Sequence, residues 1–230
     1  MQTKCLDGIA PLQIGDEVLP HTCLVLSRVG DHVDQLLNPE NQAIQNSIAS
    51  RKREFSSGRR AAHTALRQIG IEGVPIDRTG RMPNWPSGIV GSISHSNALA
   101  VATIGPDDEY VGIGIDVIPV LAVSESVGGR VLLDAERQWL SQMDSGTWRT
   151  ALYSAKESIY KAVNPIVGEF LAFDDVELRV SLESLEFSAN TTRARESSNT
   201  VKRGKGYFHR IEGHWLTIFA VSRTEDSKES

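Results

Sequence analysis

One stretch of the chain governs how the remainder is interpreted. Residues 148–163 read WRTALYSAKESIYKAV. Apolar side chains recur in it at spacings of three and four, which predicts the buried face of an α-helix; they are Leu152, Ala155, Ile159 and Ala162. Glu157 and Lys161 stand four residues apart and so are neighbours on another face. Most such pairs are solvated ion pairs that contribute about 0.3 kcal/mol, so the pair alone indicates no function.

The composition is that of an ordinary soluble globular protein. The 230 residues, 40% hydrophobic and 23% charged, suit one large domain or two small ones with a substantial core. A formal net charge of -5 argues against nucleic acid as the main partner. Cys5 and Cys23 are too few for a disulfide framework, and we interpret them as buried thiols in a reducing compartment.

No segment has the pattern of a signal peptide or of a membrane span. The N-terminal residues lack an apolar core of the required length. The longest apolar runs, residues 88–105 and 111–123, are broken by polar residues and proline. We therefore expect a cytoplasmic protein.

The flanking patterns predict a mixture of helices and strands. Helical periodicity covers residues 39–71, and residues 135–140 belong to a further helix. The helix of residues 148–163 is expected to end at Asn164-Pro165. Residues 190–206 are expected to be a mobile loop, and 224–230 a frayed tail. Strands, with hairpins at 89–104 and 207–221, are expected at residues 18–20, 23–26, 89–96, 98–104, 110–119, 170–180, 184–187, 207–211 and 214–221.

Basic residues gather between the two apolar sets of the first helical region. They are Arg51, Lys52, Arg53, Arg59 and Arg60. The cluster fits a solvated face and a polyanion site equally well, since guanidinium groups suit phosphate. Residues 77–86 are dense in turn formers and predict an irregular loop that holds Arg81 and Trp85 in place.

Two strands carry polar residues with more than one interpretation. Ser92, Ser94 and Ser96 alternate along one strand, where they either form a lightly packed edge or let a ligand approach closely. Asp116 ends a buried strand, so its carboxylate must be paired, hydrogen-bonded, bound to metal or placed at a solvent-facing edge. A metal ligand and a plain strand-end cap both remain open for Asp116.

Five motifs follow one another along the chain: GRRAA at residues 58–62, GRMPNWP at 80–86, GSISHS at 91–96, VGIGID at 111–116 and YSAKESIYKA at 153–162. In this order and spacing they resemble the Sfp/EntD-type 4'-phosphopantetheinyl transferases, with the greatest likeness to the enterobactin synthetase component D branch. The resemblance runs from about residue 51 to residue 161 and extends more thinly to the end. It implies that the 4'-phosphopantetheine arm of coenzyme A is transferred to a serine of an apo acyl, peptidyl or aryl carrier protein, with release of adenosine 3',5'-bisphosphate.

The resemblance also implies a fold. We expect an α+β protein of two similar α/β subdomains, related by a pseudo-twofold axis, with the active site in the cleft between them. Residues 1–110 would carry the motifs that bind the nucleotide of coenzyme A, and residues 111–223 the metal and the catalytic helix. The join would lie near Asp107 to Asp116. The family further implies a monomer that serves nonribosomal peptide, siderophore or polyketide synthesis.

The family implies roles for three residues in metal binding and catalysis. Asp116 and Glu157 are similar to its metal-binding carboxylates, and hard oxygen ligands suit Mg²⁺. Glu157 is also similar to the general base for the carrier serine, and Lys161 would meet the α-phosphate of coenzyme A. Lys156 belongs to the same motif, but we assign it no chemical role.

The remaining motifs imply contacts to coenzyme A. Ser94 and His95 resemble the family's nucleotide contacts, with His95 near the 3'-phosphate. Arg59 matches an arginine that meets the same phosphate, and Arg81 matches a basic residue in a Gly-[Arg/Lys]-x-Pro loop. Arg51 and Arg53 stand where other members of the family have a basic patch whose residues are less constant.

One position departs from the family pattern. The family usually reads Gly-Ile-Asp-x-Glu, with the glutamate as a further metal ligand, but Ile118 stands there in this chain. Either water completes the coordination of Mg²⁺, which the ion tolerates, or metal affinity or activity is reduced. Two alternative hypotheses remain: a degenerate homologue that binds carrier protein or coenzyme A without catalysis, and a metal-dependent phosphoryl-transfer enzyme that acts on free nucleotides.

Overall fold

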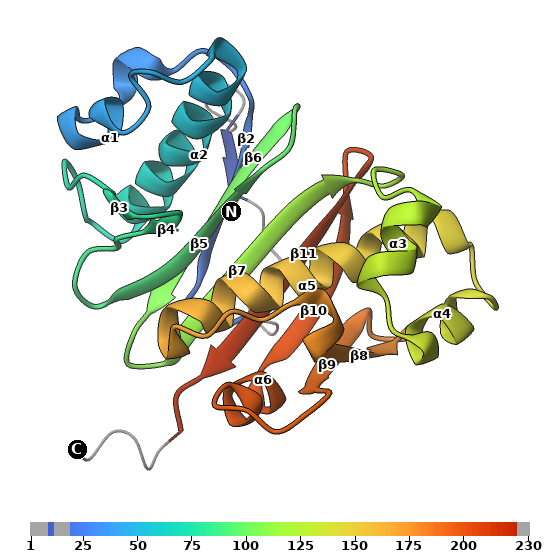
Figure 1. Ribbon diagram of the computed structural model, residues 1–230. Coiled ribbons are helices and arrows are strands. Elements are labelled where there is room, and N and C mark those ends of the chain that lie inside the picture. The colour runs from blue at the N-terminus through green and yellow to red at the C-terminus, as the bar shows by residue number, and fades with distance from the viewer. Residues whose placement is uncertain (1–8, 12–18, 225–230) are drawn as a thin grey trace. The chain divides into compact units, whose positions relative to one another are not determined.

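The computed structural model describes residues 9–11 and 19–224 of the chain, which fold into helices and sheets (Figure 1). They belong to two compact units, residues 1–110 and 111–230. The predicted α+β class is confirmed. Cys5, Val18 and residues 225–230 of the expected tail lie outside the described residues. Among the residues that are described, no helix combines the length and the hydrophobicity needed to cross a membrane.

The first unit is a long helix packed on a four-stranded antiparallel sheet. The strand order is β1 (Ile9–Pro11), β2 (Cys23–Arg28), β6 (Leu99–Pro106) and β5 (Ile89–His95). Helix α2 (Ala49–Gln68) runs along this sheet, as Figure 1 shows. The smaller elements are a 3-10 turn at Val33–Gln35, helix α1 (Asn38–Gln42), and the two-residue strands β3 (Arg78–Thr79) and β4 (Met82–Pro83).

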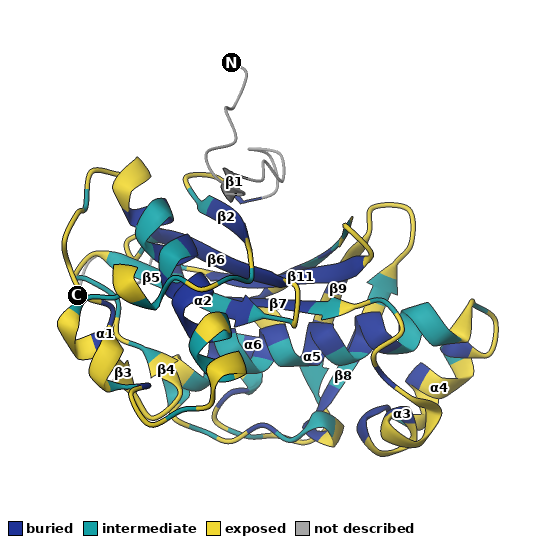
Figure 2. Cartoon of the chain, turned by 90° about the horizontal axis from the view of Figure 1, so that it is seen from above, coloured by how far each residue is buried: buried dark blue, intermediate teal, exposed yellow. Residues whose placement is uncertain are grey.

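Small side chains let α2 lie close to its sheet. Ala61, Ala62 and Ala65 are fully buried on the face of α2 that the helical period predicted. A Cβ added at Gly58 would stand 2.8 Å from Cγ2 of Ile93, so a larger residue there would displace Ile93 or move α2 away from β5. Strand β6, which faces this helix, is buried along most of its length (Figure 2).

A fully buried carboxylate, Glu40, joins three parts of the first unit. Its Oε2 accepts a hydrogen bond from the backbone N–H of Leu37 at the start of α1 (3.0 Å). Its Oε1 accepts one from the N–H of Ile76 (2.9 Å) and lies 2.7 Å from Nε2 of His63 on α2. Burial opposes ionisation of Glu40, but these hydrogen bonds and the charge of His63 outweigh burial and lower its pKa.

The second unit is a five-stranded sheet crossed by the helix that opened the sequence analysis. The strand order is β7 (Tyr110–Pro119), β11 (His214–Ser222), β10 (Lys205–Ile211), β9 (Glu186–Thr191) and β8 (Val176–Ser181). Helix α5 (Ser145–Val167) lies across one face of this sheet (Figure 1). The remaining elements are α3 (Glu125–Val131), α4 (Asp134–Leu140), a 3-10 turn at Phe173–Asp175, and α6 (Ser198–Arg203).

Two glycines of β7 let α5 contact the strand backbone directly. A Cβ at Gly114 would stand 1.9 Å from the carbonyl oxygen of Ser158, and one at Gly112 would stand 2.4 Å from that of Ala162. No side chain fits in either place. Side chains alternate along a strand, so Gly112, Gly114 and Asp116 share one face of β7. The close contact therefore brings the Asp116 carboxylate against α5.

The C-terminal end of α5 and the segment that follows it differ from the prediction. Helix α5 continues through Pro165 to Val167, because the proline lies in the last turn, where the loss of one hydrogen bond is tolerated. Gly168, at φ 66°, then ends the helix in the left-handed conformation. The strand predicted from residue 170 begins only at Val176, because Asp175 caps a 3-10 turn by accepting the N–H of Ala172 (3.0 Å).

Three other predictions about local structure are wrong. Residues 190–206 contain α6, which is held by the burial of Val201. The segment 77–86 contains the β3–β4 ladder, because Gly80 adopts φ 62° and closes a tight turn. Leu19 and Pro20 lie in a turn and not in a strand. Helix α3 was not predicted, since its two adjacent glycines have low helix propensity.

We expect Gly114→Ala to lower the free energy of unfolding by at least about 3 kcal/mol. The added methyl group overlaps backbone atoms of α5, which cannot yield unless the whole helix moves. Urea denaturation followed by far-ultraviolet circular dichroism measures the change. Gly129→Ala is the matched control, because a Cβ there meets no atom within 4 Å. A Gly114→Ala protein as stable as the wild type would contradict the close packing of α5 on β7.

Candidate functional site

The Asp116 carboxylate is the centre of a polar cluster in the second unit. The Ser154 hydroxyl on α5 donates a hydrogen bond to Oδ2 of Asp116 (2.7 Å) and lies 2.8 Å from the hydroxyl of Thr217 on β11. Nζ of Lys161 donates to Oδ1 of Asp116 (2.7 Å) and to the carbonyl oxygen of Ile115 (3.0 Å). Both oxygens of this buried carboxylate are therefore stabilised by donors, as a buried charge requires.

Lys161 connects this buried cluster with the solvent. Its side chain is 26% exposed, whereas that of Asp116 is 11% exposed. The Lys161 side chain is thus partly open to solvent, while its ammonium group is held by Asp116 and by the carbonyl oxygen of Ile115. A fixed cation of this kind stabilises negative charge more effectively than a freely moving lysine.

Tyr153 shows that Glu157 and Asp116 lie close to the same place. Burial raises the pKa of the Tyr153 phenol, and the nearby charges of Glu157 and Asp116, with a hydrogen bond to Glu157, raise it further. The ring is held by stacking on Phe173, with 5.0 Å between ring centroids. The structure therefore brings together Asp116, Glu157 and Lys161, all of which the sequence predicted.

Three further members of this cluster were missed by the sequence analysis. Ser154 stands three residues before Glu157 and seven before Lys161, a spacing that places all three on one side of α5 and that could have revealed it. Tyr153 is in the same motif, but its sequence context is that of a core aromatic residue. Thr217 lies within an apolar strand, and no sequence pattern connects it with Asp116.

The donor set fits a divalent cation of the Mg²⁺ type with few protein ligands. Asp116 and Glu157 offer hard carboxylate oxygens, and Mg²⁺ retains several waters when it binds proteins. Within residues 9–11 and 19–224, no group of three or more His, Cys, Asp or Glu residues could hold a metal. Ile118 is partly buried and packs against the hydrophobic core of the second unit, on the same face of β7 as Asp116. This position therefore adds packing where a third carboxylate would add a ligand.

In the first unit, two predicted contacts to coenzyme A lie together. Nη1 of Arg51 is 2.5 Å from Nε2 of His95, and Glu54 lies 3.6 Å from Arg51 and 3.5 Å from Nδ1 of His95. Arg51 and Glu54 are one turn apart on α2, and His95 ends β5. Glu54, which the sequence analysis did not single out, offers a carboxylate that balances these two basic groups.

Arg59 is a buried guanidinium in the same unit. It lies over the ring of Phe55 (4.5 Å) and 3.9 Å from Oε1 of Glu40. Burial lowers the pKa of Arg59 to about 10, with Glu40 opposing the shift and Arg78 adding to it. Its Nε is buried without a hydrogen-bond partner among the described residues. A buried, unsatisfied guanidinium N–H is costly, and an anionic ligand nearby would relieve that cost.

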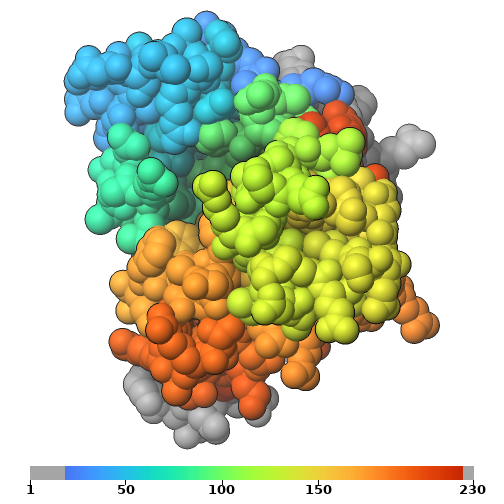
Figure 3. Space-filling view, turned by 45° about the vertical axis from the view of Figure 1, so that its right-hand side comes forward, coloured from blue at the N-terminus to red at the C-terminus, as the bar shows by residue number. Residues whose placement is uncertain are grey.

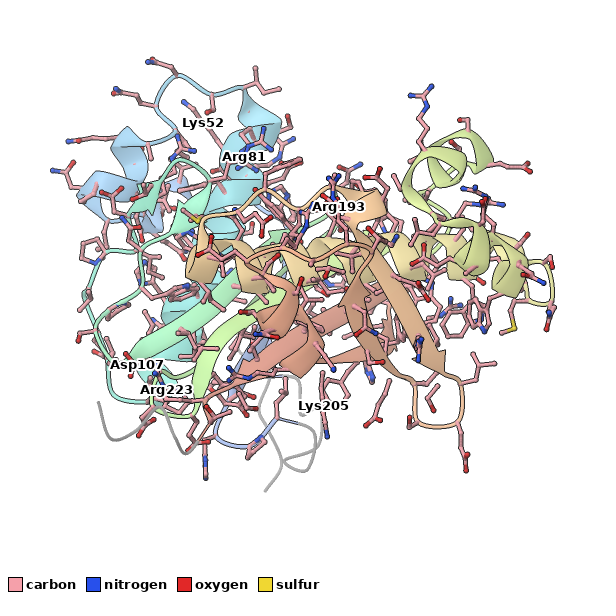
Figure 4. The ribbon with its side chains drawn as sticks, turned by 60° about the horizontal axis from the view of Figure 1, so that its bottom comes forward. Lys52, Arg81, Asp107, Arg193, Lys205 and Arg223 are labelled. Atoms are coloured by element: carbon pink, nitrogen blue, oxygen red, sulfur yellow. The ribbon has the colours of Figure 1, made fainter. Side chains whose placement is uncertain are left out.

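The other predicted contacts to coenzyme A differ in their exposure to solvent. Ser94 is buried on β5. Arg53 is exposed on α2, and Arg81 is exposed in the turn between β3 and β4. Figure 4 shows Arg81 and Lys52, which is half-buried, with their side chains in the same region of the first unit. Arg51 and Arg78 both act electrostatically on Arg59, so the base of this turn belongs to the same basic region.

Two family models match the chain. The 4'-phosphopantetheinyl transferase N-terminal domain matches residues 39–105, and the 4'-phosphopantetheinyl transferase superfamily matches residues 112–218. Together the matched segments cover most of the chain and contain every site residue that the sequence predicted. The chain belongs to the 4'-phosphopantetheinyl transferase superfamily.

Known members of this superfamily are similar over part of their length. The 4'-phosphopantetheinyl transferase Svp of Streptomyces mobaraensis is 34% identical over 161 residues, which cover 67% of this chain and 65% of the relative. Enterobactin synthase component D of Salmonella typhi is 36% identical over 131 residues, 56% of this chain and 55% of the relative. The chain thus spans less than two thirds of the length of these relatives. A solved holo-[acyl-carrier-protein] synthase of Thermotoga maritima has a TM-score of 0.40 at 18% identity, covering 50% of this chain and 65% of that chain.

Proposed function

We propose that the protein transfers the 4'-phosphopantetheine arm of coenzyme A to a serine of an apo carrier protein. The serine oxygen forms a bond to the phosphorus that carries pantetheine, the pyrophosphate P–O bond breaks, and adenosine 3',5'-bisphosphate leaves. Membership of the superfamily supports the reaction type. The observation that carries the proposal is the convergence of Asp116, Glu157 and Lys161 at the contact of β7 with α5.

The residues of the second unit suit the demands of phosphoryl transfer. Glu157 takes the proton of the attacking serine, directly or through one water. Lys161 stabilises the charge that grows on the leaving α-phosphate, and the ammonium group of this partly exposed side chain is already held in position by Asp116. Asp116 and Glu157 would hold Mg²⁺, which supplies charge neutralisation at the pyrophosphate when bound. Ser154 and Thr217 keep Oδ2 of Asp116 in place.

The basic residues of the first unit suit the nucleotide of coenzyme A. His95, Arg51 and the buried Arg59 would bind the 3'-phosphate, with Ser94 beside them. The exposed Arg53 and Arg81 would add longer-range attraction for a polyanion. The unpartnered Nε of Arg59 supports this assignment, since phosphate oxygens satisfy guanidinium donors well.

The partner is an apo acyl, peptidyl or aryl carrier protein, and the enzyme acts as a monomer in the cytoplasm. The likeness to enterobactin synthase component D supports a carrier of nonribosomal peptide or siderophore synthesis, with polyketide synthesis as the other pathway. A second candidate function rests on Ile118. A protein one metal ligand short could bind coenzyme A or carrier protein without catalysis.

Mass spectrometry of the carrier protein tests the proposal. The protein is mixed with coenzyme A, Mg²⁺ and one of several apo carriers, and we expect the carrier to gain the mass of one phosphopantetheine. Omission of Mg²⁺, with chelator present, should abolish the gain. Binding of coenzyme A without a mass gain in any carrier, at any Mg²⁺ concentration, would instead support the non-catalytic alternative. Consumption of coenzyme A with no carrier present would indicate action on free nucleotides.

Glu157→Gln and Arg59→Ala are expected to affect different steps. Glu157→Gln removes the proposed base and one proposed metal-binding carboxylate, and it should reduce kcat by about 100-fold or more. Arg59→Ala removes the buried guanidinium group, and it should raise KM for coenzyme A by about tenfold with a smaller change in kcat. Thermal unfolding of each variant identifies any effect on the fold. Arg51→Ala is a second test of phosphate binding, at a residue that is only half-buried. Equal losses of kcat with unchanged KM in Glu157→Gln and Arg59→Ala would contradict these roles.

Ile118→Glu is expected to strengthen the metal site. A third carboxylate on the same face of β7 as Asp116 should lower the Mg²⁺ concentration for half-maximal transfer by about threefold or more. Ile118→Gln has the same length without the charge and is the matched control. If both variants require as much Mg²⁺ as the wild type, the side chain at this position does not reach the metal.

A further inference from the structure

Lys156 and Glu136 form a buried ion pair beside the catalytic motif. Nζ of Lys156 lies 2.8 Å from Oε2 of Glu136, and the two side chains are 1% and 2% exposed. The ammonium also donates to the backbone oxygens of Val131 (3.0 Å) and Phe173 (2.8 Å). All three ammonium protons therefore have acceptors.

Glu136 extends this network to two further segments. Its Oε2 accepts the N–H of Leu133 at the start of α4 (2.8 Å), and its Oε1 accepts the N–H of Leu178 on β8 (3.0 Å). The pair thus joins α5 to the end of α3, the start of α4, the 3-10 turn at Phe173–Asp175, and β8. Figure 3 shows the yellow-green residues of α3 and α4 packed beside the yellow residues of α5.

A short path of contacts leads from this pair to the proposed base. The backbone oxygen of Phe173 binds Lys156, and the ring of the same Phe173 stacks on Tyr153. Tyr153 in turn hydrogen-bonds Glu157, the residue that follows Lys156. Displacement of Lys156 would therefore disturb both the rotation of α5 and the aromatic contact beside Glu157.

The first unit contains a network of the same form around Glu40. Glu40 and Glu136 are each the third residue of a short helix, α1 and α4. Each accepts a hydrogen bond from the N–H of the leucine that precedes its helix, Leu37 for Glu40 and Leu133 for Glu136. Each also accepts a backbone N–H from a segment after the long helix, at Ile76 or Leu178. Each pairs with a basic residue of the long helix, and the pairs are Glu40 with His63 and Glu136 with Lys156.

Stability alone does not account for such a pair. Replacement of a buried ion pair by apolar side chains of similar size is often neutral or stabilising, because desolvation offsets the attraction. A fully satisfied network instead fixes one arrangement of the elements that it joins. In both units the helix so fixed carries residues of the proposed site, Arg59 on α2 and Glu157 with Lys161 on α5.

We propose that Glu136 and Lys156 are positioning residues, which hold α5 and Phe173 so that Glu157 and Tyr153 face Asp116. The inference rests on the proposed transfer reaction. Lys156 is buried and bound on all three donors, so it acts through Glu157 and not on the substrates. The counterpart, Glu40 with His63, would position Arg59 for the phosphate of coenzyme A.

Steady-state kinetics of Lys156→Met test the positioning role. We expect kcat to fall at least tenfold while KM for coenzyme A changes less than about threefold. His63→Gln, in the counterpart network, should show the opposite pattern, a raised KM with a nearly unchanged kcat. Lys202→Met makes the same chemical change at an exposed lysine of α6 and should leave both values unchanged. A loss of kcat no larger than threefold in folded Lys156→Met would overturn the proposal.

The double variant Glu136→Gln/Lys156→Met removes the unpaired buried carboxylate that Lys156→Met leaves behind. It should be folded by circular dichroism and should show the same loss of kcat. If the double variant is unfolded, or if the loss of kcat only follows the fraction of unfolded protein, the pair serves folding and the positioning role is overturned.

A readout independent of transfer separates this inference from the proposed function. The protein has four tyrosines, so 3-fluorotyrosine labelling gives four fluorine resonances, and Tyr153→Phe identifies that of Tyr153. In Lys156→Met the Tyr153 resonance should shift while the resonances of Tyr110 and Tyr207 stay in place. An unchanged Tyr153 resonance would overturn the positioning role, whereas a wild type without transfer activity would overturn only the proposed function.

Discussion

The contact between the backbone of β7 and helix α5 is the constraint on which the second unit depends. It exists because Gly112 and Gly114 present no side chain where α5 passes. The contact has a chemical result as well as a packing result. Asp116 follows on the same face of the strand, so the approach that glycine permits puts its carboxylate within hydrogen-bond reach of Ser154 and Lys161. The contact that packs α5 on β7 thus also positions the Asp116 carboxylate in this unit.

Once Asp116 is buried, its charge determines what surrounds it. A carboxylate with little access to water must be compensated, and here it accepts a hydrogen bond from the Ser154 hydroxyl and pairs with the Lys161 ammonium group. The same burial makes the compensating groups stronger electrostatic partners for a ligand, because the low dielectric of the site screens them less. The side chain of Lys161 remains partly exposed, and Lys161 is therefore the cation of the cluster that an incoming phosphate can reach.

The sequence predicted the long helices and the hairpins, because those depend on local periodicity and on turn residues. The convergence of Asp116 with Glu157 on α5 was implied only by the family resemblance, since the two residues lie far apart in the chain. Prediction from the sequence failed where the deciding partner is distant. Residues 190–206 look like a polar loop until Val201 is seen to be buried, and Thr217 looks like any strand residue until Ser154 lies beside it. The contacts of Lys156 were equally hidden from the sequence, because its acceptors come from Glu136, Val131 and Phe173 on three separate segments.

Ile118 can be understood from the same face of β7. This face changes along the strand from glycines that admit α5, to a carboxylate, to an alkyl group that packs against the hydrophobic core. A glutamate at residue 118 would have to turn its charge away from that core and toward Asp116, where the repulsion of two carboxylates needs a cation to offset it. Isoleucine removes this repulsion and adds apolar burial, so β7 and α5 pack stably whether or not a metal is bound. The expected consequence is a site that depends more on water for Mg²⁺ coordination and more on Lys161 for the charge balance of Asp116.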